Sequence, residues 1–284
     1  MIQLRRIAYQ GEPGSNSHAV CEREYPTLEA VPCASFEDAF AAVERTDDGG
    51  PHADLALIPI DNSLAGRVSD IHHFLPASTL HIVAEHFHRI RFALLGVPGA
   101  SIDQLRTVHS HVHALGQCRN VIRELGLEPV ISGDTAGAAR EIAEAGDPSM
   151  AAISPPLAAS IYGLDVLRED IEDEDHNTTR FVVLSREFVV PPRGSGPMVT
   201  SFIFNVRNIP AALYKALGGF ATNGINMTKL ESYMVGGKFA ATQFLSEVDG
   251  HPDDPALARA LEELRFFTTD VKILGVYPAS PERH

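Results

Sequence analysis

Short apolar runs alternate with helix-like stretches along roughly the first 185 residues of the chain. The pattern begins with RRIAYQG, EDAFAAVERT, ADLALIPI and GRVSDIHHFL. An alternation of strand and helix favours a layered α/β fold with parallel strands. The run DLALIPI is apolar at consecutive positions, which is typical of a strand that is covered on both faces. We therefore expect an α/β architecture with a buried sheet here.

The pattern changes after residues 186–197, REFVVPPRGSGP, where adjacent prolines, glycines and a serine indicate a linker. The rest of the chain predicts strand, helix, strand, strand, helix and strand: VTSFIFNV, IPAALYKALGGFAT, INMTKLESYMV, KFAATQFLSEV, DPALARALEELRFFT and VKILGVYP. This βαββαβ order is that of the ferredoxin-like plan. The segment VGGK predicts a hairpin between the third and fourth elements, because Gly236 and Gly237 can both adopt positive φ.

Composition excludes several classes of function. The 284 residues carry a formal net charge of −14 and no run rich in Lys or Arg, which argues against binding to nucleic acid or to an anionic membrane. No window approaches the roughly 20 apolar residues of a membrane span. Three scattered cysteines, Cys21, Cys33 and Cys118, suit neither a disulfide framework nor a C-x-x-C metal site. We expect a cytoplasmic protein.

Polar groups follow two of the predicted strands, where open α/β sheets present ligand-binding residues. They are Asp61, Asn62 and Ser63 after DLALIPI, and Ser15, Ser17 and His18 within GEPGSNSH. Each group can simply cap the helix that follows, and taken singly the cap is favoured. The alternatives are a set of hydroxyls and amides that binds a carboxylate, and an aspartate that polarises a substrate hydroxyl.

The pentapeptide NTTRF, residues 177–181, stands between the acidic run REDIEDEDH and the apolar run VVLSREFVV. Arg180 offers a planar fork of donors that suits a carboxylate, and Thr178 and Thr179 offer hydroxyls that donate or accept. The cluster therefore suits an anionic ligand rich in oxygen. The alternative is a strand start whose arginine pairs with the EDED carboxylates. The acidic run itself is interpreted as a solvated face.

Histidines recur at every second position in HSHVHALGQC, at His109, His111 and His113, a spacing that can belong to a metal site. No glutamate or cysteine cluster completes a ligand set, so we predict no metal. Gln117, on the helix that follows, could reach a ligand. Cys118 is interpreted as a buried structural thiol, because a nucleophile would need a suitable base beside it.

The stretches GEPGSNSHA, ALIPIDNSLAGRV, HSHVHALGQC, AAISPPLAASIYGLDVL, NTTRF and GINMTKLES follow one another in this order. In this the chain closely resembles prephenate dehydratase with a carboxy-terminal ACT regulatory domain, over nearly its whole length. The resemblance implies a periplasmic-binding-protein-like catalytic region of two α/β subdomains over residues 1–190, with the site in the cleft between them. It implies a ferredoxin-like ACT domain over residues 198–280. The implied reaction removes the ring hydroxyl and ring carboxylate of prephenate to give phenylpyruvate, water and carbon dioxide, without a cofactor.

The resemblance assigns roles by position within these motifs. Thr179, the second threonine of TTRF, is implied to donate a hydrogen bond to the departing hydroxyl. Asp61 and Asn62 stand where the family commonly has Glu-Asn, and Gln117 matches the family's glutamine before cysteine. Arg180 is implied either to recognise a carboxylate or to order the cleft. The substrate-binding candidates are Ser15, Ser17, His18, Ser63, Thr178, Arg180 and Phe181.

For the ACT region, the resemblance implies feedback inhibition by L-phenylalanine at interfaces between paired domains, in a homodimer or homotetramer. Ala211 replaces a usual glycine in NIPAALYKAL, and Tyr233 and Met234 replace the usual Arg-Pro in LESYM. These changes add weight to a packing module that only dimerises, although ligand binding is favoured. The effector-binding candidates are Asn208, Ala211, Leu213, Asn226, Glu231 and Ser232.

The sequence therefore predicts a prephenate dehydratase of phenylalanine biosynthesis. An arogenate dehydratase is the alternative among enzymes, because arogenate differs by an amine in place of the ketone of prephenate and the motifs are shared. A non-catalytic amino-acid-sensing protein is the alternative from another class, and the intact TTRF argues against it.

Overall fold

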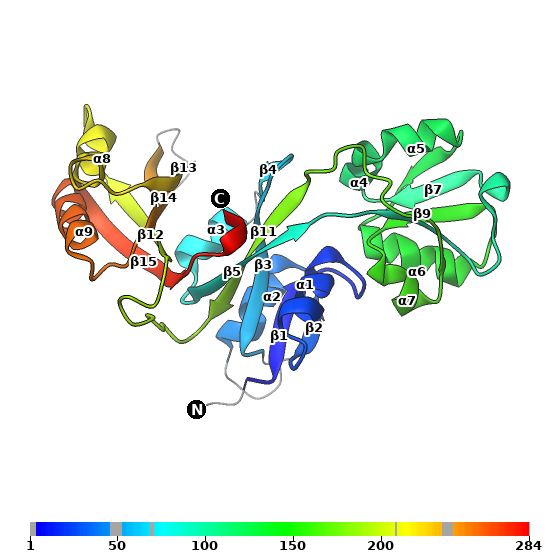
Figure 1. Ribbon diagram of the computed structural model, residues 1–284, viewed down its shortest axis with the longest axis horizontal. Helices are drawn as coiled ribbons and strands as arrows, with labels where there is room; N and C mark the ends of the chain where they lie inside the picture. Colours follow the sequence, from blue (N-terminus) through cyan, green and yellow to red (C-terminus); the bar gives the residue numbers. More distant parts are fainter. Residues whose placement is uncertain (1–3, 46–52, 69–70, 208, 235–240, 284) are drawn as a thin grey trace. The chain divides into compact units, whose positions relative to one another are not determined.

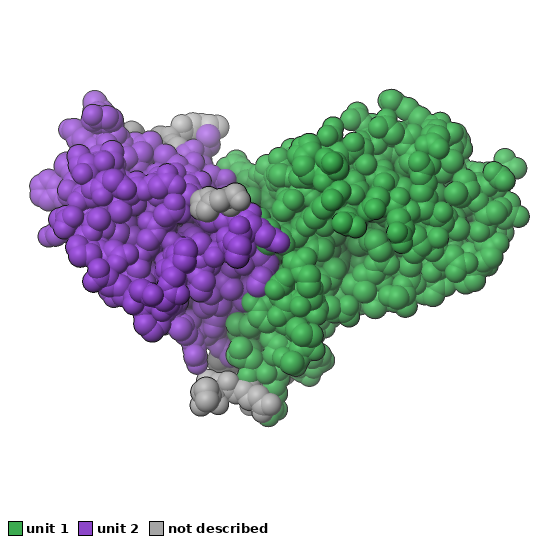
Figure 2. Space-filling view, viewed as in Figure 1, with its two compact units in different colours: residues 1–68, 87–181 green, residues 69–86, 182–284 purple. Residues whose placement is uncertain are grey.

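The computed structural model describes residues 4–45, 53–68, 71–207, 209–234 and 241–283. The chain divides into two compact units, which Figure 2 colours separately. Unit 1 comprises Met1–Val68 and Phe87–Phe181, and unit 2 comprises Ser69–His86 and Val182–His284. The chain passes from one unit to the other within two strands, β5 (His81–Arg89) and β11 (Thr178–Ser185). The predicted domain limits of 1–190 and 198–280 stay a prediction.

The first sheet of unit 1 is built on β1 (Arg6–Gln10), which lies between β2 (Glu29–Cys33) and β3 (Leu55–Asn62), all parallel (Figure 1). Helices α1 (Asn16–Glu24) and α2 (Phe36–Glu44) connect these strands. The short β4 (Gly66–Arg67) returns antiparallel on β3. Every residue from Leu55 to Ile58 is at most 5% exposed, so the predicted strand with two covered faces is confirmed.

The second sheet of unit 1 has the strand order β10-β6-β9-β7-β8. Its strands are β6 (Ala93–Gly96), β7 (Thr107–Ser110), β8 (Glu128–Ile131), β9 (Met150–Ser154) and β10 (Asp165–Arg168). The predicted parallel pairing holds for β7 with β8 and β9, whereas β6 runs antiparallel to both β9 and β10. The prediction is wrong for β6 and β10 because apolar runs report the burial of a strand and not its direction.

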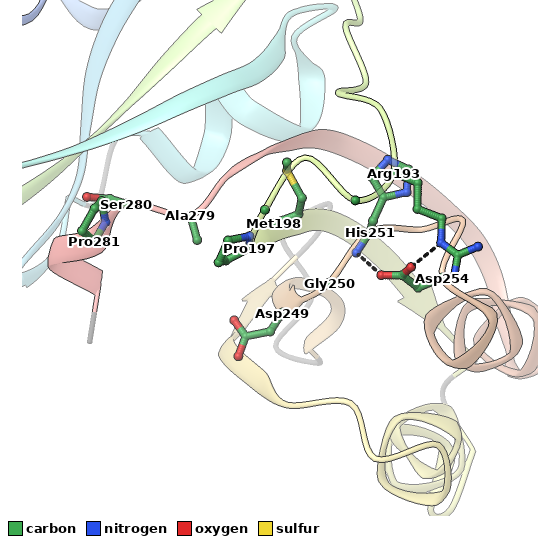
Figure 3. A pocket seen from close by; sticks show the side chains of 12 residues that line it. Arg193, Pro197, Met198, Asp249, Gly250, His251, Asp254, Ala279, Ser280 and Pro281 are labelled. Carbon is green, nitrogen blue, oxygen red and sulfur yellow. Dashed lines mark hydrogen bonds and ion pairs between the residues drawn. The ribbon is translucent and has the colours of Figure 1, made fainter.

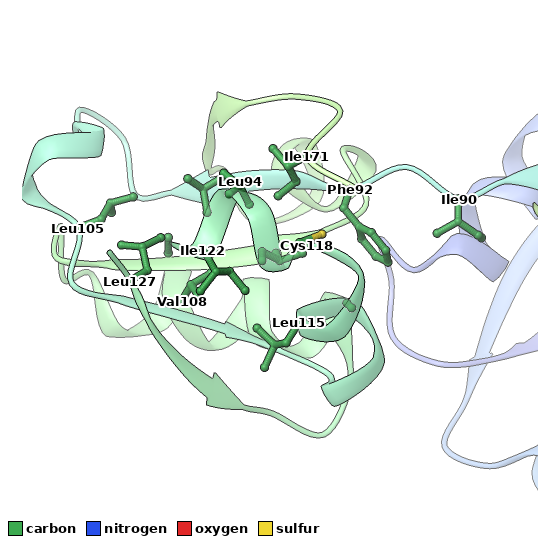
Figure 4. Packing of buried hydrophobic residues seen from close by; sticks show 14 residues of the cluster. Ile90, Phe92, Leu94, Leu105, Val108, Leu115, Cys118, Ile122, Leu127 and Ile171 are labelled. Carbon is green, nitrogen blue, oxygen red and sulfur yellow. The ribbon is translucent and has the colours of Figure 1, made fainter. Parts of the chain in front are cut away.

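Helices pack on both faces of this second sheet. They are α4 (Val112–Gln117), α5 (Arg119–Glu124), α6 (Thr135–Ala145) and α7 (Leu157–Tyr162), with a 3-10 helix, η1, at Ile102–Gln104. On one face, Leu115, Cys118 and Ile122 pack against Leu94 and Val108 of the sheet (Figure 4). The two cysteine-flanking helices α4 and α5 are therefore fixed to the sheet by an apolar core.

Unit 2 contains the predicted βαββαβ order. Its elements are β12 (Met198–Val206), α8 (Ala212–Thr222), β13 (Met227–Met234), β14 (Ala241–Asp249), α9 (Pro255–Phe267) and β15 (Thr268–Pro278). The strands are antiparallel in the order β13-β14-β12-β15. Stacked rings join helix to sheet, with Phe202 and Phe220 centred 5.7 Å apart. The predicted hairpin at Gly236 and Gly237 lies outside the described residues.

The earlier segment of unit 2 adds α3 (Ile71–Ala77) and β5, which pairs in parallel with β15 where Ile82 faces Gly275. This contact requires glycine, because a Cβ at position 275 would come within 2.1 Å of the Ile82 carbonyl oxygen.

Among the described residues, each helix is too short or too polar to form a transmembrane span. The fold is thus mixed α/β, as predicted.

A buried ionic cluster lies beside this contact. Arg283, in the 3-10 helix η2 (Pro281–Arg283), donates to Glu85 of β5 and, at 2.6 Å, to Glu247 of β14. The side chains of Glu85 and Glu247 are 0% and 1% exposed, and that of Arg283 is 7% exposed. The guanidinium also donates to Thr228 at 2.8 Å. The cluster ties the end of the described chain to β5 and to the antiparallel sheet.

Candidate active site

The end of β3 and the start of β11 meet through three side chains. Asn62 Nδ2 donates to Asn177 Oδ1 at 2.7 Å and to Thr179 Oγ1 at 2.9 Å. Asn177 and Thr179 are buried, and Asn62 is half-buried. The structure therefore brings together the sequence-predicted residues Asn62 and Thr179, 117 positions apart in the chain.

Backbone groups fix the orientation of the Asn62 amide. Its Oδ1 accepts from the N–H of Leu64 at 3.0 Å and from the N–H of Ala65 at 2.8 Å. Because a backbone N–H can only donate, the oxygen must face the turn and the NH2 group must face β11. The Thr179 oxygen thus accepts a hydrogen bond, and among the described residues none accepts from its hydroxyl proton.

Gln117 joins this group from α4, a helix that packs on the second sheet. Asn177 Nδ2 donates to Gln117 Oε1 at 2.9 Å, and Gln117 ends α4. Asn177 is the member of this hydrogen-bonded group that the sequence assignments missed, although it is the first residue of NTTRF. Its exposure of 1% could not be read from a position beside an acidic run. Gln117, Asn177, Asn62 and Thr179 therefore form one continuous chain of hydrogen bonds.

Ser63 and Thr178 hold the two strand ends together. The Ser63 N–H donates to the Thr178 carbonyl at 2.8 Å, and the Thr178 N–H donates to Ser63 Oγ at 2.9 Å. The Ser63 hydroxyl in turn donates to the His176 carbonyl at 3.0 Å. The helix-cap interpretation of Asp61 and Ser63 is wrong, because β3 continues through a turn into β4 and no described helix begins there.

Arg180 is buried beside Asp61. Its Nη1 lies 3.5 Å from Asp61 Oδ2, and the arginine side chain is 8% exposed. The ring of Phe181 is also buried and meets His88 edge-on at 6.5 Å. The Arg180 guanidinium thus lies beside the Asp61 carboxylate, whereas Phe181 belongs to the core.

The acidic run is only partly a solvated face. Glu172 accepts from the backbone N–H of Phe92 at 3.0 Å, and its side chain is 4% exposed. Asp173 accepts from the first amides of α5, those of Arg119 and Asn120, at 3.0 Å each. The interpretation as surface charge is therefore wrong for these two carboxylates, because each satisfies backbone donors that the fold leaves unpaired.

The SNSH stretch begins α1. Ser15 accepts from the His18 N–H at 3.3 Å, which confirms the helix cap. The N–H of Gly14 donates to His18 Nδ1 at 3.0 Å, and the imidazole stacks on Tyr9 with ring centres 5.3 Å apart. Ser17 is buried. The histidine is thus oriented by the loop that precedes it.

That loop is fixed on α6 and α7. Arg140 donates two hydrogen bonds to Glu12, at 2.8 and 3.1 Å, and holds the pKa of that carboxyl below its usual range. The Tyr162 hydroxyl donates to the Pro13 carbonyl at 2.8 Å. Gly14 has φ of +88°, and a Cβ there would lie 2.8 Å from the Cα of Ala158. The first sheet's glycine-rich loop therefore packs closely on the second sheet's helices.

The histidine stretch caps a helix. His111 Nδ1 accepts from the His113 N–H at 3.4 Å at the start of α4, and His109 Nε2 lies 3.2 Å from the Thr107 hydroxyl. Burial lowers the pKa of His109 and of His111. Cys118 is fully buried and burial raises its pKa. This confirms the structural thiol, because a buried thiol is a poor nucleophile.

The effector-binding candidates lie at different places in unit 2. Asn226 donates to Asp249 at 2.7 Å, beside the start of β12. Glu231 lies 3.0 Å from Lys229, and Ser232 is exposed beside it. At the other end of the sheet, Ala211 precedes α8 with φ of +61°, and Leu213 packs on the core. Asn208 lies outside the described residues.

Unit 2 also contains a cavity of about 890 Å³ (Figure 3). Arg193 donates to Asp254 at 2.7 Å, and the backbone N–H of His251 donates to the same carboxylate at 3.3 Å. The His251 ring is held by the Pro191 carbonyl at 2.9 Å and by the Asp253 N–H at 3.1 Å. Because these polar groups are satisfied by one another, the hydrogen-bonded chain in unit 1 is the better candidate for catalysis.

Comparison with known proteins gives the following matches. Residues 7–188 match the family described as prephenate dehydratase. The chain is 51% identical over 280 residues to "Bifunctional N-acyl-homoserine lactone acylase/prephenate dehydratase" of Komagataeibacter europaeus, with 98% of each chain covered. It is 39% identical to "Arogenate dehydratase/prephenate dehydratase 2, chloroplastic" of Arabidopsis thaliana, with 96% of this chain and 72% of that protein covered. The structure of a prephenate dehydratase in complex with L-Phe from Arthrobacter aurescens superposes with a TM-score of 0.87 at 29% identity, with 98% of this chain and 91% of that chain covered.

Proposed function

The chain belongs to the prephenate dehydratase family of decarboxylating lyases, and on that premise we propose that its own substrate is prephenate, which it converts to phenylpyruvate, water and carbon dioxide. The observation that carries this proposal is the pair of hydrogen bonds from Asn62 to Asn177 and Thr179. It supports the proposal because it leaves the Thr179 hydroxyl proton available to a departing hydroxyl group.

The reaction needs little covalent help from the protein. The ring C–O bond breaks as the ring carboxylate leaves as carbon dioxide, and the electron pair of the broken C–C bond completes the aromatic ring. The departing oxygen gains negative charge and takes up one proton to leave as water. Thr179 donates a hydrogen bond to that oxygen and stabilises it as the charge develops. A threonine hydroxyl is a weak acid, so its role is that of an oriented donor.

Substrate binding requires recognition of two carboxylates. We assign this to the buried Arg180 and to the first turn of α1, where Ser15, Ser17 and His18 lie. Free N–H groups at a helix start and a buried guanidinium both favour anions. Asp61, which lies 3.5 Å from the Arg180 guanidinium, then orients that guanidinium toward a substrate carboxylate.

Turnover of prephenate by the purified chain tests this proposal, with phenylpyruvate as the measured product. Thr179→Ala should lower kcat by about 100- to 1,000-fold, the usual cost of removing one oriented hydrogen-bond donor. Thr179→Ser keeps the hydroxyl and should recover most of the loss. Near-normal kcat in Thr179→Ala would refute the assignment of Thr179.

Arogenate is the competing substrate within the family, and the Arabidopsis relative carries both names. Measuring kcat/KM on both substrates separates them, and turnover confined to arogenate would refute our choice. Absence of turnover on either, with retained binding of phenylalanine, would favour the amino-acid sensor.

We further propose that the βαββαβ part of unit 2 is an ACT domain that binds L-phenylalanine between two chains of a homodimer or homotetramer in the cytoplasm. The element order, the strand order and the L-Phe complex of the Arthrobacter aurescens enzyme support this proposal. Calorimetric titration with L-phenylalanine should detect binding that Asn226→Ala weakens. Unchanged binding in that variant, or none in the parent chain, would refute this placement.

A second activity can be assayed directly, because the Komagataeibacter europaeus relative is named as an N-acyl-homoserine lactone acylase and shares 51% of its residues with this chain. We propose that incubation with an N-acyl-homoserine lactone be followed by detection of the released fatty acid. Release that survives Thr179→Ala would place amide hydrolysis at a different group of residues, and absence of release would limit the chain to lyase activity.

A further inference from the structure

We propose that Asn177 is a positioning residue that sets the direction of the hydrogen bonds through the site, so that Gln117 and Thr179 both present donors to the substrate. This inference rests on the proposed function. It concerns a residue without a predicted role, whose side chain is buried at the junction of the two sheets of unit 1.

The direction begins at the turn after β3. The N–H groups of Leu64 and Ala65 require the Asn62 oxygen to face them, which turns the Asn62 NH2 group toward β11. Both hydrogens of that NH2 group are then used, one by Thr179 Oγ1 and one by Asn177 Oδ1. The orientation of the Asn62 amide is therefore imposed by the two backbone N–H groups, because an N–H group can only donate a hydrogen bond.

Asn177 passes this direction on. Because its oxygen accepts from Asn62, its NH2 group must point the other way, where it donates to Gln117 Oε1 at 2.9 Å. The backbone carbonyl of Asn177, just before β11, also accepts from the N–H of Ile90, just after β5, at 2.8 Å. This hydrogen bond fixes the backbone of Asn177. With 1% exposure, Asn177 has no exchange with water that could relax this orientation.

Two donors result at the ends of the chain of hydrogen bonds. Gln117 Oε1 is occupied, so the Gln117 NH2 group is directed away from Asn177, and no described residue accepts from it. The Thr179 oxygen is occupied as an acceptor, so its proton is available. Donors suit a reaction in which an oxygen gains negative charge, whereas a lone pair in either position would repel it.

The substitution Asn177→Asp tests the direction with a side chain of the same shape. When the introduced carboxyl group is ionised it can only accept, so the Gln117 amide must rotate to donate to it and present Oε1 to the substrate. When the introduced carboxyl group is neutral the original direction returns, because its carbonyl accepts from Asn62 and its O–H donates to Gln117. Burial favours the neutral acid at pH values above the usual range for aspartate, so activity should recover as the pH falls.

We expect the kcat of Asn177→Asp relative to the parent chain to be about 100-fold lower at pH 8.5 and to recover at least about tenfold by pH 5.5, with KM changed less. The uncatalysed conversion is subtracted at each pH. Asn177→Ala, which removes the side chain, should lose activity to the same extent at every pH. Melting temperatures measured at each pH distinguish a variant that unfolds from a folded variant whose hydrogen bonds to Gln117 have reversed.

Gln117→Glu provides a second test that does not depend on a buried substitution. It keeps an acceptor for Asn177 and presents a carboxylate oxygen in place of the NH2 group, so it should also lose activity at pH 8.5 and recover at low pH. A pH-independent ratio for Asn177→Asp, or full activity of Gln117→Glu at pH 8.5, would overturn the inference. If the parent chain turns over neither prephenate nor arogenate, the proposed function fails instead and takes this inference with it.

Discussion

Replacing Arg283 by methionine should destabilise unit 2 strongly. The substitution keeps much of the apolar volume of the side chain and removes the charge that pairs with Glu85 and Glu247. Both glutamate side chains are at most 1% exposed, so water cannot take the place of the guanidinium. Removing one partner of a buried ion pair typically costs about 3–5 kcal/mol, because the remaining charge loses its counter-ion in a site that water cannot enter.

Urea unfolding followed by circular dichroism measures the loss of unfolding free energy in Arg283→Met relative to the parent chain. The control is Arg168→Met, because Arg168 pairs with Glu124 at 2.9 Å with both side chains exposed, and solvent screens an exposed pair so that it contributes little to stability. The double variant Arg283→Met with Glu85→Gln should recover part of the loss, since it removes one buried charge. A loss of unfolding free energy below about 1 kcal/mol in Arg283→Met would refute this reasoning.

Three further predictions concern titration, backbone strain and thiol reactivity. Burial, assisted by the Arg23 guanidinium, lowers the pKa of His88 to about 4. The part of the unfolding free energy that depends on neutral His88 is therefore complete above about pH 6.5 and is lost as the pH falls through 4. Because His88→Gln cannot take up this proton, the variant should lose up to about 3 kcal/mol less unfolding free energy in acid than the parent chain. Ala211 has φ of +61°, a conformation that costs roughly 1–2 kcal/mol outside glycine, so Ala211→Gly should raise the melting temperature by an amount that corresponds to up to about 1 kcal/mol after the added chain entropy. All three cysteines are buried and free, and burial raises the pKa of Cys21 to about 12, so a thiol reagent at pH 8 should modify none of them until urea unfolds the chain; rapid labelling of the folded protein would contradict this assignment.

The sequence predicted those features of the fold that depend on the residue pattern within one segment. Consecutive apolar residues predicted the covered strand β3, and the six-element pattern after residue 197 predicted the order found in unit 2. Strand direction in the second sheet was not predictable, because the side-chain pattern of β6 is the same in either direction. The inclusion of residues 69–86 in unit 2 depends on the pairing of β5 with β15, for which no local pattern exists.

For the candidate site, the sequence predicted the members at strand ends and missed the residue between them. Asn62 and Thr179 follow or begin apolar runs, and such positions meet at a sheet edge. Asn177 contacts Gln117 across 60 positions of chain, and this contact exists only once the two sheets are folded together. Glu172 and Asp173 were misread for a related reason, since a run of carboxylates does not reveal which members bind backbone amides.

The common direction of the hydrogen bonds from the turn after β3 to Gln117 has a consequence for evolutionary drift in relatives of this protein. Exchanging an amide for a carboxylate or a hydroxyl at one position reverses or interrupts every bond beyond it, because each amide's orientation depends on the preceding one. Positions 62, 117 and 177 should therefore covary across lineages, changing in concert or staying fixed, while the exposed turn at Leu64 and Ala65 drifts freely in side chain, since it contributes only its backbone.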